Sequence, residues 1–493
     1  MRPDGTISPE TAARRFLDSL VQPSRILVAI SGGSDSTGLL LSLSDALKAA
    51  PRSRISLCAA TVDHAMRAES ADEARQVAAL CRSLGIAHVT KVWQGPKPKA
   101  GIMAAARDAR YALLAEAAAE LAADIIVTAH TLDDQRETLV MRGLRSTANM
   151  TGIADAVLYD RRVWVVRPFL QCLRQEIRDC LRRSENTWFD DPSNDDPTYE
   201  RVRTRQKLAG RGISLEELAM MAAARQELAA GAARWLDAHV SVHGAMLGHL
   251  SQAGLAVERV LLGHGLSRLA AVFGGQPFAL GREPMGSVLD FVAAGRPGRV
   301  TAGRVIFDLR RDGLYLARET RGILPLALAA GERGVWDGRY VVNNCSEVDI
   351  VVSALEGAAP TGSLIPVLVT GAQPRRGGAA KDPLAPKDLG ALGSRDEHRN
   401  EGGGGSAAGN LRVEETSRLP KSALRRALAA QPHISASAIS TDLPNQIRIE
   451  PYFALFDRFL TRFDFIFADS LAAAFGARPY PKPPLGLIDG KTI

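Results

Sequence analysis

The sequence has few cysteines, few aromatic residues and no long apolar run, and each shortage excludes a class of protein. Its five cysteines stand apart without a Cys-x-x-Cys pair, which argues against a disulfide framework or a zinc ribbon. No uncharged stretch reaches about eighteen apolar residues, and the N-terminus lacks the apolar core of a signal peptide. We therefore expect a soluble protein in the reducing environment of the cytoplasm.

The overall composition is that of a large, mildly basic globular protein. Aromatic residues account for 5% of the chain and hydrophobic residues for 46%, much of it alanine, which favours helices in the less patterned regions. A chain of 493 residues exceeds what one hydrophobic core usually serves, so two or three domains are expected. The net charge of +7 is compatible with a polyanionic partner but does not identify one.

A loop with two glycines lies between the apolar run at residues 26–30 and the leucine-rich stretch at residues 37–47. Its sequence is Ser31-Gly32-Gly33-Ser34-Asp35-Ser36. The flanking patterns predict a buried strand that runs into a helix, which places the loop at the strand's carboxyl end. The glycines allow close approach of the backbone and the serines add donors, so we predict a phosphate-binding loop. The spacing of a Walker A loop is absent, which excludes a P-loop of the kind that transfers a γ-phosphate.

Short apolar runs alternate with amphipathic segments as far as residue 170. Further strands are predicted at residues 55–62, 86–93 and 124–128, with helices at residues 70–84 and 102–122. This alternation is typical of an α/β fold with a doubly wound, mostly parallel sheet of the Rossmann-like kind. Ligands of such sheets bind at the carboxyl ends of the strands, where this chain places Asp63, His64 and His130.

An acidic helix follows His130. Asp134 and Glu137 stand three residues apart and Asp133 and Glu137 four apart, so the carboxylates share one face. Like charges repel unless a cation lies between them, and hard oxygen ligands suit Mg²⁺ that bridges to phosphates. The simpler interpretation, an acidic first turn that complements the helix dipole, explains Asp133 well but Glu137 poorly.

Taken together, the loop resembles the pyrophosphate (PP) loop of the N-type ATP pyrophosphatases, and the later motifs resemble those of the tRNA(Ile)-lysidine synthetase family. These later motifs are Val62-Asp63-His64-Ala65-Met66-Arg67, Ala109-Arg110-Tyr111, Thr128-Ala129-His130, Asp133 to Thr138, Arg167-Pro168-Phe169 and Asp191-Pro192-Ser193-Asn194. They keep the family's order over residues 25–210. One departure is Arg145-Ser146-Thr147-Ala148, where the family has a glycine-rich turn.

The resemblance implies a two-step reaction on RNA. ATP adenylates the C2 oxygen of the wobble cytidine in the CAU anticodon of a minor isoleucine tRNA, and free lysine then displaces AMP to give lysidine. A carboxylate, Asp134 or Glu137, could take the proton of the lysine amine, whose ordinary pKa is about 10.4.

The site residues are assigned from the same resemblance and from their chemistry. ATP would be bound by Ser31, Gly32, Gly33, Ser34, Asp35, Ser36, Asp63, His64 and His130. Mg²⁺ would be held by Asp35 and Asp134, and the catalytic residues would be Asp35, Asp134, Glu137 and Arg110.

RNA contacts are predicted after the first domain. Helical spacing would place Arg201 and Arg205 on one face, and with Arg203 they could grip phosphates. On charge alone, a solvated face paired with nearby aspartates is an equally good interpretation, and the neighbouring motifs favour RNA binding.

Three regions are predicted: a PP-loop ATPase domain at residues 1–212, a helical tRNA- or substrate-binding region at 213–300, and a mixed α+β C-terminal module at 301–493 with a flexible insertion near 371–410. Trp336-Asp337-Gly338-Arg339 is either a packed turn or a substrate contact. Residues 451–475 are predicted to form a docking helix that closes the C-terminal module.

Two rival functions remain. A 2-thiocytidine-type tRNA-modifying enzyme would use a similar loop but needs paired cysteines. A non-catalytic tRNA-binding protein of the same fold would be expected to have lost Asp35 or the acidic helix, and both are intact. The sequence leaves open whether the chain forms a homodimer.

Overall fold

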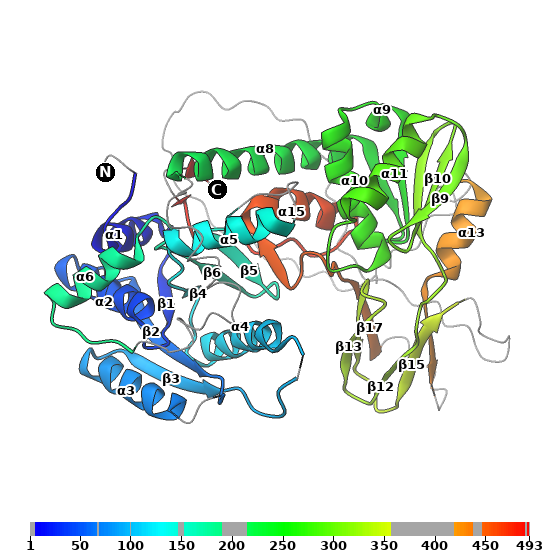
Figure 1. Cartoon of the computed structure of the whole chain (residues 1–493). Helices are drawn as coiled ribbons and strands as arrows, with labels where there is room; N and C mark the ends of the chain where they lie inside the picture. Colours follow the sequence, from blue (N-terminus) through cyan, green and yellow to red (C-terminus); the bar gives the residue numbers. More distant parts are fainter. Residues whose placement is uncertain are drawn as a thin grey trace, which may run out of the picture.

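The computed structural model describes residues 5–66, 69–98, 100–145, 152–189, 214–355, 419–436, 446–488 and 491–492 (Figure 1). Several predicted features lie outside these residues. They are Arg201, Arg203 and Arg205, the segment at 191–194, the turn at 146–148 and the insertion at 371–410.

The first unit, residues 5–189, alternates strands and helices as the sequence predicts. Its elements are α1 (Pro9–Ser19), β1 (Ser24–Ala29), α2 (Ser34–Ala49), β2 (Ile55–Asp63), α3 (Ser70–Ser83), β3 (Ala87–Val92), α4 (Ile102–Glu120), β4 (Ile125–Val127), α5 (Leu132–Arg145), β5 (Ala156–Tyr159), β6 (Val163–Val166) and α6 (Arg174–Arg183).

A seven-stranded sheet with the order β18-β5-β6-β4-β1-β2-β3 forms the centre of this unit. The five strands from β6 to β3 are parallel, whereas β5 and β18 (Phe459–Thr461) pair antiparallel at one edge. The chain steps from β1 outward to β3 and then returns to place β4 on the other side of β1. The carboxyl ends of β1 and β4 therefore flank a topological switch point, where open α/β sheets bind their ligands.

The two faces of the sheet are covered by different helices because side chains alternate along each strand. Ile26 and Val28 of β1 share a core with residues of α1, α2 and α6. Leu27, between them, packs on the opposite face with Tyr111 and Leu114 of α4. Burial on both faces explains why these strands are continuously apolar.

The middle unit, residues 214–318, combines helices with an antiparallel sheet of order β7-β8-β11-β10-β9. Its elements are α8 (Leu215–His239), β7 (Val240–His243), β8 (Leu247–Ser251), α9 (Gln252–Leu255), α10 (Arg259–Gly274), α11 (Arg282–Ala293), β9 (Gly298–Ala302), β10 (Val305–Arg310) and β11 (Gly313–Arg318). The boundary predicted between residues 300 and 301 falls within β9, and strands from both sides of it share this sheet.

The C-terminal unit consists of two small sheets with the orders β12-β15-β16 and β13-β14-β17, and α13 packs beside the middle sheet. Its elements are β12 (Leu326–Leu328), β13 (Arg333–Trp336), β14 (Tyr340–Asn344), β15 (Ile350–Ala354), α13 (Lys421–Ala429), β16 (Pro432–Ala436) and β17 (Ile447–Pro451). None of the helices among the described residues is both long and apolar enough to cross a membrane.

The turn at residues 336–339 is packed inside the protein. The Trp336 side chain is 1% exposed, and its indole N–H donates a hydrogen bond to the Leu324 carbonyl at 3.0 Å. Asp337 lies between the guanidinium groups of Arg318 and Arg339, and all three side chains are buried. The packing interpretation of this motif therefore holds, because its side chains are not accessible to a substrate.

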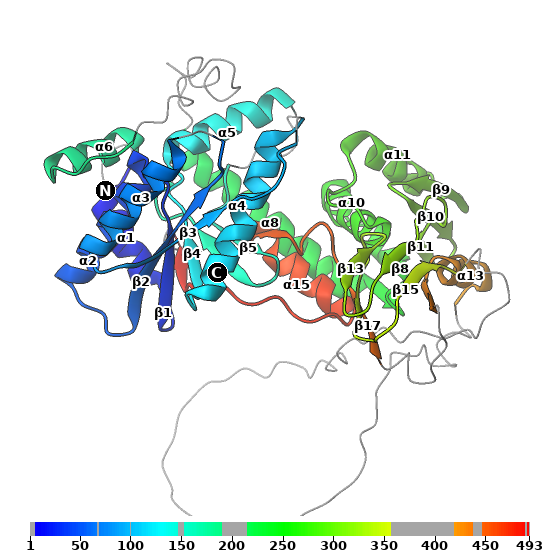
Figure 2. The same cartoon turned by 90° about the horizontal axis from the view of Figure 1, so that it is seen from below.

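The chain ends by returning to the first unit. After β18 come η2 (Arg462–Asp464), α15 (Phe465–Ala474), β19 (Leu487–Ile488) and β20 (Lys491–Thr492). The prediction that this segment closes the C-terminal module is wrong, because α15 packs along α8 and β18 extends the first sheet. Figures 1 and 2 show α8 and α15 together bridging the first unit and the rest of the chain.

Candidate nucleotide-binding active site

The Ser31–Ser36 loop leaves the carboxyl end of β1 and becomes the first turn of α2. Gly32 has a φ of +86°, a conformation that favours glycine, and a Cβ atom there would lie 2.6 Å from the Phe189 ring. The Ser36 hydroxyl accepts a hydrogen bond from the Ser31 N–H at 3.1 Å and donates to the Gly33 carbonyl at 3.2 Å. Ser36 therefore shapes the loop, while Ser31 is exposed to a ligand.

The first turn of α2 offers backbone donors at the switch point. Gly33 is the N-cap residue, and among the described residues no side chain accepts a capping hydrogen bond from this turn. A helix N-terminus of this kind presents N–H groups and the positive end of the helix dipole to an anion. The loop and α2 together can therefore bind phosphate groups.

Three carboxylates from two helices converge on one guanidinium group, that of Arg174. Its Nε atom lies 3.0 Å from Asp35 Oδ2 and its side-chain nitrogens lie 3.1 Å from Asp134 Oδ1 and 3.7 Å from Glu137 Oε1. Glu137 is buried, whereas Arg174, Asp35 and Asp134 each keep about a fifth of their side chains exposed. We call these four side chains the Arg174 cluster.

The position of Arg174 depends on close packing between α2 and α6. Gly38 faces Ile177, and a Cβ atom at residue 38 would lie only 2.3 Å from the Ile177 methyl group Cγ2. Because residue 38 has no side chain, α6 approaches α2 closely enough for Arg174 to reach Asp35. Arg178, one turn further along α6, adds a contact of 3.4 Å to the Ser34 hydroxyl.

Asp133 and Asp134 also stabilise helix starts. Asp133 Oδ2 accepts a hydrogen bond from the Arg174 N–H at 2.8 Å, so it caps α6 and not the helix to which it belongs. Asp134 Oδ2 accepts hydrogen bonds of 2.8 Å from both the N–H and the hydroxyl of Thr131. The carboxylate of Asp134 is therefore oriented by its own helix as well as by Arg174.

The cluster shifts the pKa values of its two more exposed carboxylates in opposite directions. Burial raises the pKa of Asp35 above its usual range, with Arg174 opposing and Asp134 adding to the shift. Burial also acts to raise the pKa of Asp134, but Arg174, His130 and the Thr131 hydrogen bonds outweigh it and lower the pKa. Carboxylates with divergent environments are suited to different roles in one reaction.

His130 lies at the end of β4 beside this cluster. Its Nδ1 atom is 3.0 Å from the Thr128 hydroxyl. Burial and then the charge of Arg167 lower the pKa of His130 to about 3, although Asp134 opposes this. A neutral imidazole can position a substrate by hydrogen bonding without adding a positive charge.

His64 and Arg110 form a second group at the end of β2. The Arg110 nitrogens lie 3.3 and 3.4 Å from His64 Nε2, and the ring of His64 meets Trp93 edge to face at 5.9 Å. Burial and then Arg110 lower the pKa of His64 to about 4. Asp63 accepts a hydrogen bond from the Ala65 N–H at 2.8 Å, and its charge opposes the lowering of the His64 pKa.

The structure thus brings the predicted residues Asp35, Asp134 and Glu137 to one point and His64 and Arg110 to another. Sequence reasoning missed Arg174, Phe189 and Trp93. The signal that could have identified Arg174 was the acidic face of α5, because carboxylates that share one face are stabilised by a nearby cation. We had assigned that role to a metal ion.

The donor set fits Mg²⁺ that binds together with phosphate. Asp35 and Asp134 supply carboxylate oxygens beside the loop amides, close enough for Asp134 to affect the pKa of Asp35. Within the part of the chain that the structure describes, no three Asp, Glu, His or Cys side chains are arranged to hold an ion alone. Mg²⁺ commonly takes one or two protein carboxylates and completes its shell with phosphate oxygens and water.

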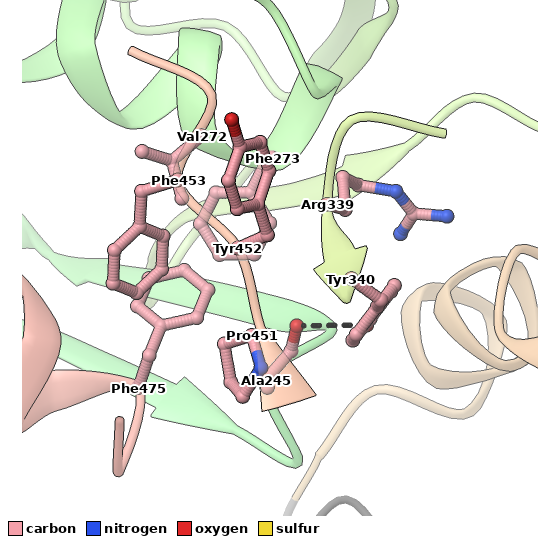
Figure 3. Close-up of a pocket in the computed structure, with 9 residues that line it drawn as sticks. All are labelled: Ala245, Val272, Phe273, Arg339, Tyr340, Pro451, Tyr452, Phe453 and Phe475. Carbon is pink, nitrogen blue, oxygen red and sulfur yellow. Dashed lines mark hydrogen bonds between the residues drawn. The ribbon is translucent and has the colours of Figure 1, made fainter. Parts of the chain in front are cut away.

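A small recess elsewhere is unrelated to this site. It lies among Phe273, Phe453, Phe475 and Arg339, where the middle unit meets the C-terminal residues (Figure 3). Its cavity volume is about 10 Å³, which is room for no more than a water molecule.

Residues 8–211 match the family model of the PP-loop domain. The chain is 38% identical to the tRNA(Ile)-lysidine synthase of Rhizobium meliloti (strain 1021) over 488 residues, which covers 96% of each chain. It is 36% identical to the tRNA(Ile)-lysidine synthase of Mesorhizobium japonicum, over 93% of this chain and 94% of the relative. The chain belongs to the tRNA(Ile)-lysidine synthase family.

Membership of the lysidine synthase family agrees with the position of the site. The PP-loop domain model covers the Ser31–Ser36 loop, the acidic start of α5 and Arg174. The match to full-length lysidine synthases extends over the middle and C-terminal units as well. The resemblance drawn from the sequence motifs is confirmed, and so is the mostly parallel α/β fold of the first unit.

Proposed function

We propose that this chain forms lysidine in an isoleucine tRNA with a CAU anticodon, using ATP and free lysine. The observation that carries the proposal is the convergence of Asp35 and Asp134 beside the Ser31–Ser36 loop at the sheet's switch point. The relatives that match the whole chain bear the name of this activity.

In the first step, the C2 oxygen of the wobble cytidine attacks the α-phosphorus of ATP. The bond to the β-phosphate bridging oxygen breaks, and pyrophosphate leaves. The loop amides and the N-terminus of α2 stabilise the negative charge on the departing phosphates. Mg²⁺ held by Asp35 and Asp134 would neutralise further phosphate charge.

In the second step, the lysine ε-amine attacks C2 and AMP leaves with the former C2 oxygen. The amine must lose a proton, because its ordinary pKa of about 10.4 keeps it charged at neutral pH. Asp134 and Glu137 are the carboxylates near the loop that could accept it. Arg110, which lies 3.4 Å from His64, would contact a phosphate or the base.

The 2-thiocytidine alternative is less well supported. All five cysteines are free, and Cys58, Cys81 and Cys172 are buried. Burial raises the pKa values of the Cys81 and Cys172 thiols, to about 11 and about 12, which makes them poor nucleophiles and poor cluster ligands.

The test is to incubate the full chain with the isoleucine tRNA, ATP, Mg²⁺ and isotopically labelled lysine, followed by mass analysis of the nucleosides. We expect one labelled lysidine per tRNA with release of AMP and pyrophosphate. A matched tRNA with uridine at the wobble position is the control and should take up none. Pyrophosphate exchange that does not depend on the tRNA, or the absence of labelled nucleoside, would contradict the proposal.

A further inference from the structure

In the Arg174 cluster, three carboxylates share one guanidinium group. Glu137 is buried in this cluster, whereas Asp35 and Asp134 keep about a fifth of their side chains exposed. One turn further along α6, Arg178 lies 3.4 Å from the Ser34 hydroxyl. Arg174 is therefore a partner common to all three carboxylates.

Arg174 occupies the position that a metal ion would need. Its guanidinium contacts one oxygen each of Asp35 and Asp134, the two carboxylates whose donor set fits Mg²⁺. A guanidinium and a dication cannot both contact these oxygens closely without strong mutual repulsion. Binding of the metal therefore requires the Arg174 side chain to leave at least one of its partners.

The surroundings allow the side chain to move while its backbone stays in place. The packing of Ile177 against Gly38 and the hydrogen bond from the Arg174 N–H to Asp133 fix the start of α6. Thr131 orients Asp134 independently of Arg174. The arginine side chain itself keeps about a fifth of its surface exposed beside the phosphate-binding loop.

We propose that Arg174 is a resident counter-cation that holds Asp35 and Asp134 before the substrate binds and turns to the phosphates when nucleotide brings in the metal. This inference rests on the proposed function, because it assumes that metal and ATP share this site. It makes Arg174 a positioning residue for the carboxylates and a phosphate contact afterwards. Metal without nucleotide should bind weakly. It has to displace the Arg174 guanidinium from the carboxylates, and no phosphate is present to pair with the displaced guanidinium.

The test separates metal binding from nucleotide binding. Mn²⁺ alone is titrated into the full chain and followed by electron paramagnetic resonance, and Mn²⁺ with a non-hydrolysable ATP analogue is titrated in parallel. In Arg174→Met we expect Mn²⁺ alone to bind about tenfold more tightly, because a competing positive charge is gone. The Mn²⁺–analogue complex should bind about tenfold more weakly, because a phosphate contact is lost.

Two further variants make the result decisive. Arg174→Lys retains the charge and should keep the weak binding of Mn²⁺ alone. Arg259→Met, which removes an exposed arginine paired with Asp290, should change neither affinity. Circular dichroism spectra of all variants establish that each is folded.

The inference is overturned if Arg174→Met binds Mn²⁺ alone no more tightly than the unaltered chain does. That outcome would leave the lysidine assay positive, so the proposed function would survive. An unaltered chain that makes no lysidine would refute the proposed function. The titration with Mn²⁺ alone would still decide the role of Arg174.

Discussion

Two clusters of arginine and carboxylate side chains, one in each half of the molecule, have opposite proportions of the two groups. In the Arg174 cluster one guanidinium faces three carboxylates, whereas in the C-terminal half Asp337 lies between Arg318 and Arg339. The side chains around Asp337 are 1% to 6% exposed, but Arg174 and Asp35 are 20% and 22% exposed. A second cluster of the Asp337 kind places Asp464 between two arginines.

The difference separates a cluster that serves structure from one that serves a ligand. Around Asp337 each guanidinium makes further hydrogen bonds to backbone carbonyls, so the buried charges are satisfied by the protein itself. The Arg174 cluster is acidic, partly open and adjacent to uncapped helix amides. This contrast predicts that the Arg174 cluster contributes to ligand binding and the Asp337 cluster to stability, and the variants below test it.

The largest expected effect is on stability at Asp337. Asp337→Asn leaves Arg318 and Arg339 buried without a carboxylate, which should lower the free energy of unfolding by about 3–5 kcal/mol. Asparagine tolerates the φ of +51° at this position, so backbone strain does not contribute to the measured change in the free energy of unfolding. Urea denaturation followed by circular dichroism measures the change, and a loss below about 1 kcal/mol would contradict the structural role.

Asp35→Asn should instead reduce turnover. We expect lysidine formation to slow by about 10²–10³-fold, equivalent to about 2.7–4 kcal/mol of lost transition-state stabilisation. The unfolding free energy should not fall, because burial of the Asp35 carboxylate raises its pKa and therefore disfavours its charged form in the folded chain. Steady-state incorporation of labelled lysine, with urea denaturation as the control, measures both quantities. Unchanged turnover would remove Asp35 from the site.

Gly38→Ala tests how Arg174 is positioned. The added methyl group would meet Ile177, and such overpacking typically costs about 1–3 kcal/mol. The displacement of α6 should also weaken binding of the ATP analogue. Gly286→Ala in α11 is the matched control, because a Cβ atom there has open space. If both variants behaved alike, α2 and α6 would not be packed as described.

The smallest effect concerns His264, beside Asp464 and its two arginines. Burial and then the charge of Arg268 lower the pKa of His264 to about 3, although Asp464 opposes this. Between pH 6.5 and about 3, the unfolded chain binds a proton at His264 that the folded chain does not bind. The free energy of unfolding therefore falls as the pH falls, by up to about 1.4 kcal/mol per pH unit.

His264→Gln should remove this contribution. The difference in unfolding free energy between pH 7 and pH 5.5 should be smaller in the variant than in the unaltered chain, as measured by urea denaturation at both values. An unchanged difference would show that His264 is protonated in the folded protein.

The sequence predicted the parts of the fold that local pattern controls. The alternation of apolar runs and amphipathic segments defined β1 to β4 and their helices, and the motifs located the loop and the acidic start of α5. What it missed depends on contacts between distant residues. Asp133 was interpreted through the dipole of its own helix, yet it caps α6. The acidic face of α5 was interpreted through a metal ion alone, yet it also faces Arg174.

The docking of the chain's end could not be derived from periodicity either. The segment at residues 451–475 was expected to be a docking helix, but only α15 within it is an α-helix, and its partners are α8 and β5. Pairing between residues about 300 apart leaves no trace in local spacing, because the edge of β5 accepts any suitable strand.

The pairing of β18 with β5 has a consequence for biogenesis. During translation the nucleotide-binding sheet is made early, but its outer strand β18 is synthesised 300 residues after the strand β5 with which it pairs, Phe459 lying opposite Tyr159. Until then, β5 presents an open row of backbone donors and acceptors that can recruit strands from other nascent chains. Premature termination before residue 459 would therefore yield an aggregation-prone fragment, even though every residue of the loop and the acidic cluster had already been synthesised.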